Sequence, residues 1–336
     1  MDNRTDITVL GAGSWGTAIA ISLSGNGHRV SLWDIDQEHL LDMKKTRENR
    51  KYLPGVTFPE TLVISESRRR ALEEAKVVIF SVPAQHFRKA AREAKEEIPQ
   101  NAVIVNTAKG IEQDSLMRLS QIARQELGEM PYVVISGPSH AEEVSRGLPT
   151  TLVSASQDRE LAQRIQDLFM SPCLRVYTSS DVIGVELGGA LKNIIALGAG
   201  ISDGMGFGDN AKAAMMTRGI AEMARLGVAM GADEKTFGGL SGIGDLIVTC
   251  TSMHSRNRRC GILIGEGVSP QQAISQVGMV VEGMYTAKAA YELAKQYEVE
   301  MPITEQIYLA IQGRVDARDA VAALMGRQKR HEVEPL

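Results

Sequence analysis

The segment that most restricts the fold of this chain is Gly11-Ala12-Gly13-Ser14-Trp15-Gly16, a G-x-G-x-x-G pattern directly after the β-branched run 7–10. An amphipathic stretch beginning at Thr17 follows it, so the pattern lies at a predicted turn from strand to helix. Here the first glycine permits the tight turn, the second lets backbone approach a pyrophosphate, and the third lets helix and strand pack closely. The alternative is an ordinary glycine turn, but the flanking strand and helix favour a dinucleotide-binding loop.

The first half of the chain alternates short β-branched runs with amphipathic stretches. The runs predict buried strands at 7–10, 29–33, 77–80, 103–105, 132–135, 151–154 and 174–177. The stretches between them predict helices near 17–26, 36–46, 66–75, 84–97, 115–127 and 158–169. Strands that alternate with helices of this length are typical of βαβ units and a parallel sheet. We therefore expect an α/β fold whose N-terminal domain is a Rossmann-type doubly wound sheet.

After Tyr177 the sequence changes to segments with helical spacing, which predicts a mainly α-helical C-terminal domain. Asp181 and Asn210 are the expected N-caps of helices that run to about residues 200 and 229, and Ser269 is the expected N-cap of a helix with Pro270 at its first position. Further helices are predicted near 284–297, 303–312 and 316–326. The 336 residues fit two domains of about 150 residues each. We place them at 1–180 and 181–336, with the expected ligand site in a cleft between them.

The end of the second predicted strand bears on the choice of cofactor. Asp34 lies 18 residues after Gly16, where an acidic group can accept hydrogen bonds from the ribose 2′-OH of NAD and would repel the 2′-phosphate of NADP. Asp36 is an equal candidate for this role. Arg29 or Lys44 could still support NADP, so the residues favour NAD without excluding NADP.

Two loops follow predicted strands, at the sheet edge where open α/β folds bind ligands. Lys109 comes after the strand 103–105, and the segment Gly137-Pro138-Ser139-His140-Ala141-Glu142 comes after the strand 132–135. Either loop alone could be an ordinary surface loop. Because both strands end at the same edge, we expect the two loops to converge on one site.

Lys192 lies in a predicted helix among small and apolar neighbours. At positions i−4, i−3 and i+3 it has Gly188, Gly189 and Ile195. Such a lysine is snorkelling, ion-paired or functional. Desolvation lowers a lysine pKa towards neutrality, which suits an acid/base group in alcohol and ketone chemistry. The two glycines would let a ligand or another backbone approach.

Two segments of the second domain complete the candidate site. Asp245, in Gly242-Ile243-Gly244-Asp245-Leu246, could orient a lysine amine or a substrate hydroxyl. The segment Ser255-Arg256-Asn257-Arg258-Arg259 offers guanidinium, hydroxyl and amide donors that suit a phosphate. A solvated basic turn is the alternative. The basic tail 327–331 has that character, and we assign it no function.

Composition excludes several classes of function. The net charge of −4 and the aromatic content of 4% argue against nucleic acid binding. Three cysteines without a C-x-x-C spacing predict neither a disulfide framework nor a metal site. The N-terminus lacks the apolar core of a signal peptide, and the chain has no run of 18 apolar residues, so we expect a cytoplasmic protein without an integral membrane segment. The 32 glycines exceed the usual share, and we place most of that excess at ligand sites.

Six motifs, in this order and spacing, resemble bacterial NAD(P)-dependent glycerol-3-phosphate dehydrogenase over almost the whole chain. They are the glycine loop with Ser14-Trp15, the segment 106–110, the segment 137–142, Leu191-Lys192-Asn193, the segment 242–246 with Ser255-Arg256-Asn257, and Val281-Glu282-Gly283. The resemblance implies interconversion of sn-glycerol 3-phosphate and dihydroxyacetone phosphate, run towards glycerol 3-phosphate for phospholipid synthesis.

The resemblance also implies roles for individual residues. Lys192 would be the proton donor and acceptor. The substrate site would be lined by Lys109, Gly137, Ser139, Lys192, Asp245, Ser255, Arg256 and Asn257. Besides the loop glycines, the cofactor would meet Ser14, Trp15, Lys109, Ala141, Arg256, Val280 and Glu282. Many family members carry arginine after the tryptophan of the second strand, whereas this chain has Trp33-Asp34, which puts strict NADP preference in doubt.

The hypothesis for the reaction is hydride transfer from the nicotinamide to the ketone carbon, with Lys192 protonating the alkoxide and Lys109 adding positive charge. Arg256 and Asn257 would anchor the phosphate. The alternatives are a related two-domain dehydrogenase for a β-hydroxy acid or a phosphorylated sugar acid, and a binding protein that senses dinucleotides without chemistry. The apolar positions of the helical domain, Met215-Met216 among them, suit a homodimer.

Overall fold

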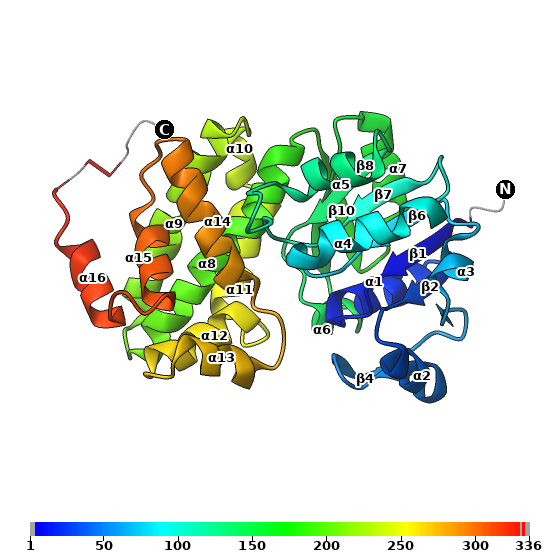
Figure 1. The fold of residues 1–336 in the computed structure, drawn as a ribbon, viewed down its shortest axis with the longest axis horizontal. Coiled ribbons are helices and arrows are strands. Elements are labelled where there is room, and N and C mark those ends of the chain that lie inside the picture. Colours follow the sequence, from blue (N-terminus) through cyan, green and yellow to red (C-terminus); the bar gives the residue numbers. More distant parts are fainter. Residues whose placement is uncertain (1–3, 330, 333–336) are drawn as a thin grey trace. The chain divides into compact units, whose positions relative to one another are not determined.

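The computed structural model describes residues 4–329, 331 and 332. Contacts within the chain divide it into two compact units (Figure 1). Unit 1 comprises Met1–Ala108 and Leu119–Val182, and unit 2 comprises Lys109–Arg118 and Ile183–Leu336. The ten residues after Ala108 therefore belong to the helical unit, although the expected division at residue 180 placed them in the first domain. They do so because Ile111 is fully buried in the apolar core of unit 2.

Unit 1 is built on one eight-stranded sheet with the order β10-β9-β8-β7-β6-β1-β2-β5. The strands are β1 (Asp6–Leu10), β2 (Arg29–Trp33), β5 (Val63–Ile64), β6 (Val77–Phe80), β7 (Val103–Asn106), β8 (Tyr132–Ser136), β9 (Thr150–Ala155) and β10 (Leu174–Ser179). The strand order reverses between β1 and β6, which is where open α/β sheets bind ligands. The expected Rossmann-type class is confirmed.

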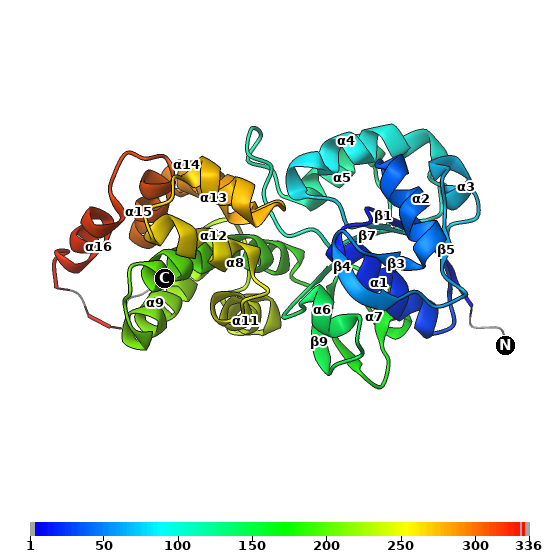
Figure 2. The same ribbon diagram turned by 90° about the horizontal axis from the view of Figure 1, so that it is seen from below.

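Helices cover both faces of this sheet: α4 and α5 lie on one face, and α1 and α7 lie on the other (Figure 2). The helices of unit 1 are α1 (Ser14–Gly25), α2 (Gln37–Thr46), α3 (Arg68–Leu72), α4 (Ala84–Ala94) with a 3₁₀ turn (Lys95–Glu97), α5 (Leu119–Leu127), α6 (Ala141–Val144) and α7 (Arg159–Phe169). The sheet core is made of apolar side chains from the strands, such as Val9, Leu32 and Ile79. Because helices cover both faces of the sheet, the side chains on both sides of each strand are buried, which explains the continuous apolar runs in the sequence.

For unit 1, one expectation held only in part, one was wrong, and one pair of strands was missed. The sheet is not wholly parallel, because β9 pairs antiparallel with β8. The intervening α6 has only four residues, too few to return the chain along the sheet as a crossover helix does. Helix α5 begins at Leu119 rather than near residue 115, since Leu116 has a φ of 59°, which an α-helix does not permit. An antiparallel pair, β3 (Glu48–Asn49) and β4 (Leu53–Thr57), was not expected at all.

The described secondary structure of unit 2 is helical apart from one isolated antiparallel β-bridge between Ile111 and Arg118. Its elements are α8 (Val182–Gly204, whose first residue belongs to unit 1), α9 (Asp209–Ala229), α10 (Glu234–Phe237), a π-turn η2 (Leu240–Gly244), α11 (Asp245–Thr251), α12 (Arg256–Gly265), α13 (Pro270–Val277), α14 (Glu282–Gln296), α15 (Pro302–Ile311) and α16 (Ala317–Met325). Ser269 is the N-cap of α13, with Pro270 at the first position, as predicted. Asn210 is not an N-cap. The chain enters α9 in extended conformation at Gly208, so the helix begins one residue before Asn210.

Helix α8 forms the centre of unit 2. It is long and apolar enough to cross a membrane, but 94% of its most apolar 18-residue window is buried inside the protein, as expected of a core helix. It crosses α12 at close range through two pairs of glycines. A Cβ on Gly200 or Gly204 would overlap a carbonyl oxygen of α12, and a Cβ on Gly261 or Gly265 would overlap one of α8. Part of the glycine excess therefore serves helix packing rather than ligand binding.

We expect Gly261→Ala to destabilise the protein. Alanine favours a helix by about 1 kcal/mol over glycine, but the added Cβ would overlap the carbonyl oxygen of Leu197, and overpacking costs roughly 1–3 kcal/mol or more. Urea and thermal unfolding should therefore show a lower stability. Gly25→Ala, in α1, is the matched control because a Cβ there meets nothing within 4 Å. Equal stability of the two variants would contradict close α8–α12 packing.

Candidate functional site

The three glycines of the loop between β1 and α1 have different structural surroundings. Gly11 has a φ of +109°, and a Cβ on it would come within 2.7 Å of the carbonyl oxygen of Ser81. Gly16 is enclosed, since a Cβ there would overlap the carbonyl oxygen of Gly11. Gly13 faces open space, with nothing within 4 Å of a Cβ. The loop thus has two packing glycines and one whose backbone is open to a ligand, as the motif predicts.

The N-terminus of α1 extends this open face. Gly13 is its N-cap and supplies no side-chain hydrogen bond, so the first N–H groups of the helix are not capped by a side chain. Helix N-termini of this kind bind phosphate through N–H groups and the helix dipole. Next in the chain, the indole nitrogen of Trp15 is buried without a hydrogen-bond partner in the described structure. Both observations fit the pyrophosphate end of a dinucleotide cofactor.

The two aspartates after β2 have different surroundings. Asp36 is the N-cap of α2: its carboxylate accepts the N–H of His39 and pairs with Lys51 at 3.0 Å, and these partners hold its pKa below the usual range. Asp34 accepts the N–H of Ala12 at 2.6 Å and the N–H of Asp36 at 3.0 Å. Asp34 therefore touches the glycine loop, whereas Asp36 is occupied in capping a helix. The role of either residue at a ribose stays a prediction, and contact with the loop favours Asp34.

The segment Lys109–Arg118 is fixed to unit 2 at three points. Lys109 Nζ bonds to Asp245 Oδ2 at 2.6 Å, and the carbonyl of Lys109 accepts from the side chain of Asn193 at 3.2 Å. At the other end, Arg118 forms a 2.7 Å ion pair with Glu186, whose side chain is only 4% exposed. Lys109 follows β7 in sequence, as predicted, but its side chain belongs to the helical unit.

Lys192, Asp245 and Lys109 form a buried cluster. Asp245 is 1% exposed and bridges the two lysines, with Oδ1 at 2.8 Å from Lys192 Nζ and Oδ2 at 2.6 Å from Lys109 Nζ. Lys192 is 6% exposed, so it does not snorkel to solvent. Its ammonium also donates to Thr249 Oγ1 at 2.7 Å. An ammonium has three N–H donors, so one is left for a substrate oxygen.

Burial controls the electrostatics of this cluster. Desolvation lowers the pKa of Lys192 from its ordinary 10.5 to about 8; Lys109 adds to the shift, while Asp245 opposes it. For Asp245, burial acts to raise the pKa, but the charges of Lys109 and Lys192 outweigh it, and the pKa lies below its ordinary value. The result is a lysine whose pKa is lowered to about 8, beside a carboxylate that remains ionised at neutral pH.

Thr249 is the residue of this cluster that sequence reasoning missed. It is 3% exposed, accepts from Lys192, and donates to the carbonyl oxygen of Asp245 at 2.6 Å. Its position four residues after Asp245 on α11 places both on one helix face. That spacing was the available signal, but it becomes informative only once α11 is known to begin at Asp245.

A glycine and a π-turn bring Asp245 to Lys192. The π-turn η2 ends immediately before Asp245, and its Ser241 carbonyl lies so close to α8 that a Cβ on Gly188 would come within 2.6 Å of it. Gly242 is equally enclosed, since a Cβ there would overlap the carbonyl oxygen of Phe237. Of the two possibilities considered for Gly188, approach of a ligand or of another backbone, the structure shows another backbone.

The basic segment at the start of α12 is partly structural. Ser255 is the N-cap, and its Oγ accepts the N–H of Arg258. Arg258 pairs with Asp203 at 2.8 Å, so it does not act as a surface phosphate ligand. Arg256 occupies the first helical position. The expected three-arginine anion site is therefore reduced by one, because a carboxylate of α8 already neutralises Arg258.

The Asn257 amide is part of a buried network. Its Nδ2 donates to Asn193 Oδ1 at 2.9 Å, and its Oδ1 accepts the N–H of Gly283 at 2.8 Å. Asn193 in turn holds the carbonyl of Lys109. Through Gly283 the network reaches Glu282 at the start of α14. Asn257 thus ties the start of α14 to the residue beside Lys192.

The remaining predicted residues lie at chain turns. Gly137 has a φ of +125°, and its carbonyl accepts from Ser139 Oγ at 2.8 Å. Ala141 opens the short helix α6 in unit 1. Val280 directly precedes the N-cap of α14, and Glu282 is its first residue, in unit 2. The candidate cofactor residues are therefore distributed over both units.

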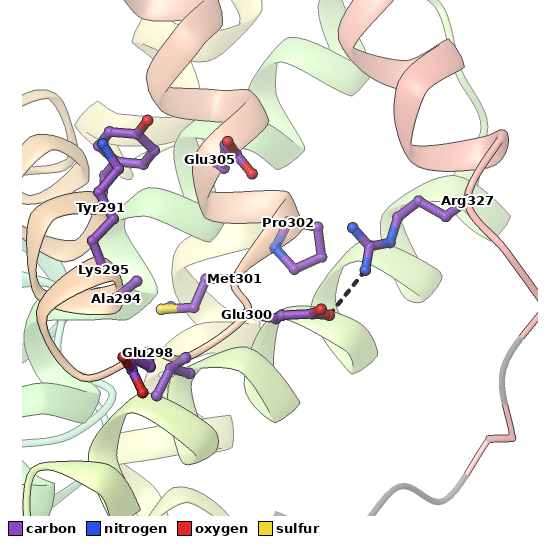
Figure 3. A pocket seen from close by; sticks show the side chains of 10 residues that line it. Tyr291, Ala294, Lys295, Glu298, Glu300, Met301, Pro302, Glu305 and Arg327 are labelled. Atoms are coloured by element: carbon purple, nitrogen blue, oxygen red, sulfur yellow. Dashed lines mark hydrogen bonds and ion pairs between the residues drawn. The ribbon is translucent and has the colours of Figure 1, made fainter.

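A pocket of about 350 Å³ lies elsewhere in unit 2, around the α14–α15 turn (Figure 3). Arg327 and Glu300, which both line it, form an ion pair at 3.2 Å (Figure 3). Lys295 lies over the ring of Tyr291 at its edge. None of the predicted site residues lines this pocket, and we assign it no role in the site.

Comparison with known proteins identifies the family. Residues 6–162 match the N-terminal part, and residues 181–322 the C-terminal part, of NAD-dependent glycerol-3-phosphate dehydrogenase. The chain belongs to this family. It is 55% identical to glycerol-3-phosphate dehydrogenase (NAD(P)+) of Pelotomaculum thermopropionicum, over 98% of this chain and 95% of that protein. It is also 55% identical to the enzyme of the same name from Moorella thermoacetica, over 98% of both chains.

The fold of the glycerol-3-phosphate dehydrogenase family agrees with this structure. The crystal structure of the family member from Coxiella burnetii matches with a TM-score of 0.93 and 38% identity, over 96% of this chain and 99% of that one. The resemblance inferred from the six motifs is therefore confirmed, as are the α/β class and the enzyme assignment.

Proposed function

We propose that this chain reduces dihydroxyacetone phosphate to sn-glycerol 3-phosphate with NADH or NADPH, reversibly, and so supplies glycerophospholipid synthesis. The observation that carries the proposal is the buried cluster in which Asp245 holds Lys192 and Lys109 within 2.8 Å. We assign unit 1 to the dinucleotide, and unit 2 to the substrate and the acid/base chemistry.

The cofactor site that we propose begins at the glycine loop. Gly11, Gly13 and Gly16 shape it, and Ser14 and Trp15 start the helix that faces the phosphates. Ala141 in unit 1, and Lys109, Arg256, Val280 and Glu282 in unit 2, are the further contacts implied by the family motifs. When bound, the nicotinamide cofactor supplies the hydride that converts the ketone carbon to an alcohol carbon.

Lys192 supplies the proton. As the carbonyl oxygen gains negative charge, the remaining N–H of the ammonium donates to it and the proton passes from Nζ to oxygen. In the reverse direction the neutral amine accepts the proton of the alcohol. Lys109 adds positive charge on the other side of Asp245, and such charge counts most where water is excluded. Asp245 and Thr249 keep the lysine in place.

The phosphate of the substrate is assigned to the start of α12 in unit 2. Arg256 offers a planar guanidinium at the N-terminal end of α12, where the helix dipole also favours an anion. Ser255 and Asn257 complete this lining within unit 2, and for Gly137 and Ser139 of unit 1 a substrate contact is what the family motifs imply. Since both ends of the Asn257 amide are engaged within unit 2, we expect Asn257 to contribute through its backbone and by holding neighbours in position.

We further propose that the protein is a cytoplasmic homodimer. All three cysteines are free, with Cys250 and Cys260 buried, which suits a reducing compartment. Ala213, Ala214 and Thr217 of α9 are exposed, and Met215 and Met216 beside them are half-buried. This weakly polar face is compatible with a subunit contact. Sedimentation of the purified protein tests the dimer directly.

An assay that follows NADH and NADPH separately tests the function. With dihydroxyacetone phosphate, both coenzymes should be oxidised, and NADH should be used with the higher kcat/KM because the Asp34 carboxylate repels a 2′-phosphate. In the direction of alcohol oxidation, phosphorylated sugar acids and β-hydroxy acids replace glycerol 3-phosphate as control substrates. No oxidation of either coenzyme, or a faster reaction with a control substrate, would contradict the proposal. A higher kcat/KM with NADPH would contradict only the role of Asp34.

A further inference from the structure

Ala12, between the first two glycines of the loop, is held by two side chains from distant parts of unit 1. Its N–H donates to Asp34 Oδ2 at 2.6 Å, and its carbonyl accepts from Asn49 Nδ2 at 2.9 Å. Ala12 itself is fully buried. A loop that the motif describes as a local feature of residues 11–16 is therefore fixed from two outside points.

Asn49 is well placed to fix the loop, because every polar group of its amide is engaged. The residue is 0% exposed and lies on β3, in the small sheet that the sequence did not predict. Its second Nδ2 hydrogen goes to Thr17 Oγ1 at 2.8 Å, and its Oδ1 accepts the N–H of Tyr52 at 3.0 Å. A buried amide with all partners satisfied has one orientation.

Planarity of the peptide bond connects this contact to the ligand side of the loop. The carbonyl of Ala12 and the N–H of Gly13 belong to one trans peptide, so they point in opposite directions. Asn49 draws the carbonyl into the protein, and the N–H of Gly13 must then point away from it. Gly13 is the loop residue whose Cβ position is open, with no atom within 4 Å.

Without that restraint, the Ala12 carbonyl keeps only the longer hydrogen bond from Thr17 Oγ1 at 3.4 Å, and the peptide could rotate at low cost. Glycine tolerates almost all backbone angles, so a loop with glycines at 11 and 13 does not hold its own peptide planes. A rotated Ala12–Gly13 peptide would present a carbonyl oxygen instead of an N–H to a phosphate. That arrangement repels the anion which the N-terminus of α1 attracts.

We propose that Asn49 is a positioning residue of the dinucleotide site, which turns the N–H of Gly13 towards the pyrophosphate by holding the carbonyl of Ala12. The proposal rests on the proposed function, in that unit 1 binds the coenzyme. The role of Asn49 differs from that of Asp34. The pyrophosphate is common to NAD and NADP, so Asn49 affects both equally, whereas Asp34 lies at the strand end that reads the ribose.

Binding measurements on the purified full-length protein test this role. We expect Asn49→Ala to raise the Kd for NADH and for NADPH by the same factor, about tenfold, as loss of one ordering hydrogen bond implies. Asn49→Asp keeps the size of the side chain and the acceptor for Tyr52, but puts an oxygen against the Ala12 carbonyl. It should weaken both coenzymes at least as much. Titration by coenzyme fluorescence gives both constants without turnover.

Asn26→Ala is the matched control. Asn26 also uses its amide to hold backbone carbonyls in unit 1, those of Leu168, Phe169 and Met170, but it does not bond to the loop. It should lower Tm without changing either Kd. Amide hydrogen exchange in the coenzyme-free protein provides a second measurement: Gly13 and Ser14 should exchange faster in both Asn49 variants than in the Asn26 variant.

Three results would overturn the proposal: a Kd within about twofold of wild type in a folded Asn49 variant, a change for only one coenzyme, or unchanged exchange at Gly13 and Ser14. The exchange measurement also decides the matter if the alanine variant unfolds and only the aspartate variant can be studied. Failure of the proposed function is separate, because it would appear as absence of coenzyme binding in the wild-type protein.

Discussion

Replacement of Lys192 by methionine is expected to lower kcat for dihydroxyacetone phosphate reduction by about 10²- to 10⁴-fold, the usual contribution of a positioned acid or base. Methionine has a similar length and is apolar, so it suits a position that is 6% exposed. Steady-state kinetics with NADH in excess give the value. The KM for NADH should change little, because Lys192 contacts Asp245 and Thr249 rather than the glycine loop.

The direction of the pH dependence follows from the pKa of about 8 for Lys192. Reduction needs the ammonium, so its rate should fall as the pH rises through about 8. Oxidation of glycerol 3-phosphate needs the neutral amine, so its rate should rise over the same interval. In Lys192→Met both limbs should disappear from the residual activity, which a purely structural loss would not produce.

Two further substitutions separate chemistry from packing. Lys192→Arg keeps a positive charge that cannot release its proton, so it should be nearly as inactive as the methionine variant. Lys212→Met removes another partly buried, ion-paired lysine of unit 2, bound to Asp203 at 2.8 Å, and should retain wild-type turnover. A fall of less than tenfold in a folded Lys192→Met would show that the proton comes from elsewhere.

Asp245→Asn is the second change with a large expected effect. The asparagine keeps the shape but removes the charge that holds two lysines, and breaking a buried ion pair in this way costs about 3–5 kcal/mol. We expect a lower Tm and a fall in kcat/KM on the order of 10²-fold, comparable to the loss of one electrostatic group in an active site. Circular dichroism and steady-state kinetics give the two quantities.

The pH profile gives the more specific result for Asp245→Asn. The carboxylate opposes the lowering of the Lys192 pKa, so its removal should lower that pKa further, and the descending limb of the reduction rate should move below pH 8. Asp203→Asn is the control, since Asp203 likewise holds two cations, Lys212 and Arg258. It should reduce stability and leave the limb in place. A limb that moves equally in both variants would argue against a specific link between Asp245 and Lys192.

Local sequence patterns predicted most of the fold. The β-branched runs and the glycine loop identified β1, α1 and the doubly wound sheet, because a buried parallel strand needs a continuous apolar run and a phosphate loop needs glycine at fixed positions. The same patterns did not reveal the direction of β9. The sequence of an apolar strand does not show whether the strand runs parallel or antiparallel to its neighbour. That depends on the connection between the two strands, and the connection from β8 to β9 contains only the four-residue helix α6.

The sequence predicted which charged residues form the candidate site, but not which residues contact one another there. Lys192 was identified by the glycines and isoleucine beside it, and Asp245 by a glycine-rich segment. Thr249 and Asn49 had no comparable signal. A threonine in a helix and an asparagine in a polar stretch of sequence are common, and only the partners found in the folded chain, Lys192 for one and Ala12 for the other, give them a role.

The sequence by itself determined the family, the α/β class and the glycine loop, because these depend on neighbours in the chain and on the spacing of turn residues. Tertiary structure decided how Asp245 bridges Lys109 and Lys192, why Lys109 belongs to the helical unit, and that Gly200 and Gly261 serve a helix crossing. These features join residues more than 50 positions apart. Their energies come from burial and close contact, which a linear pattern does not record.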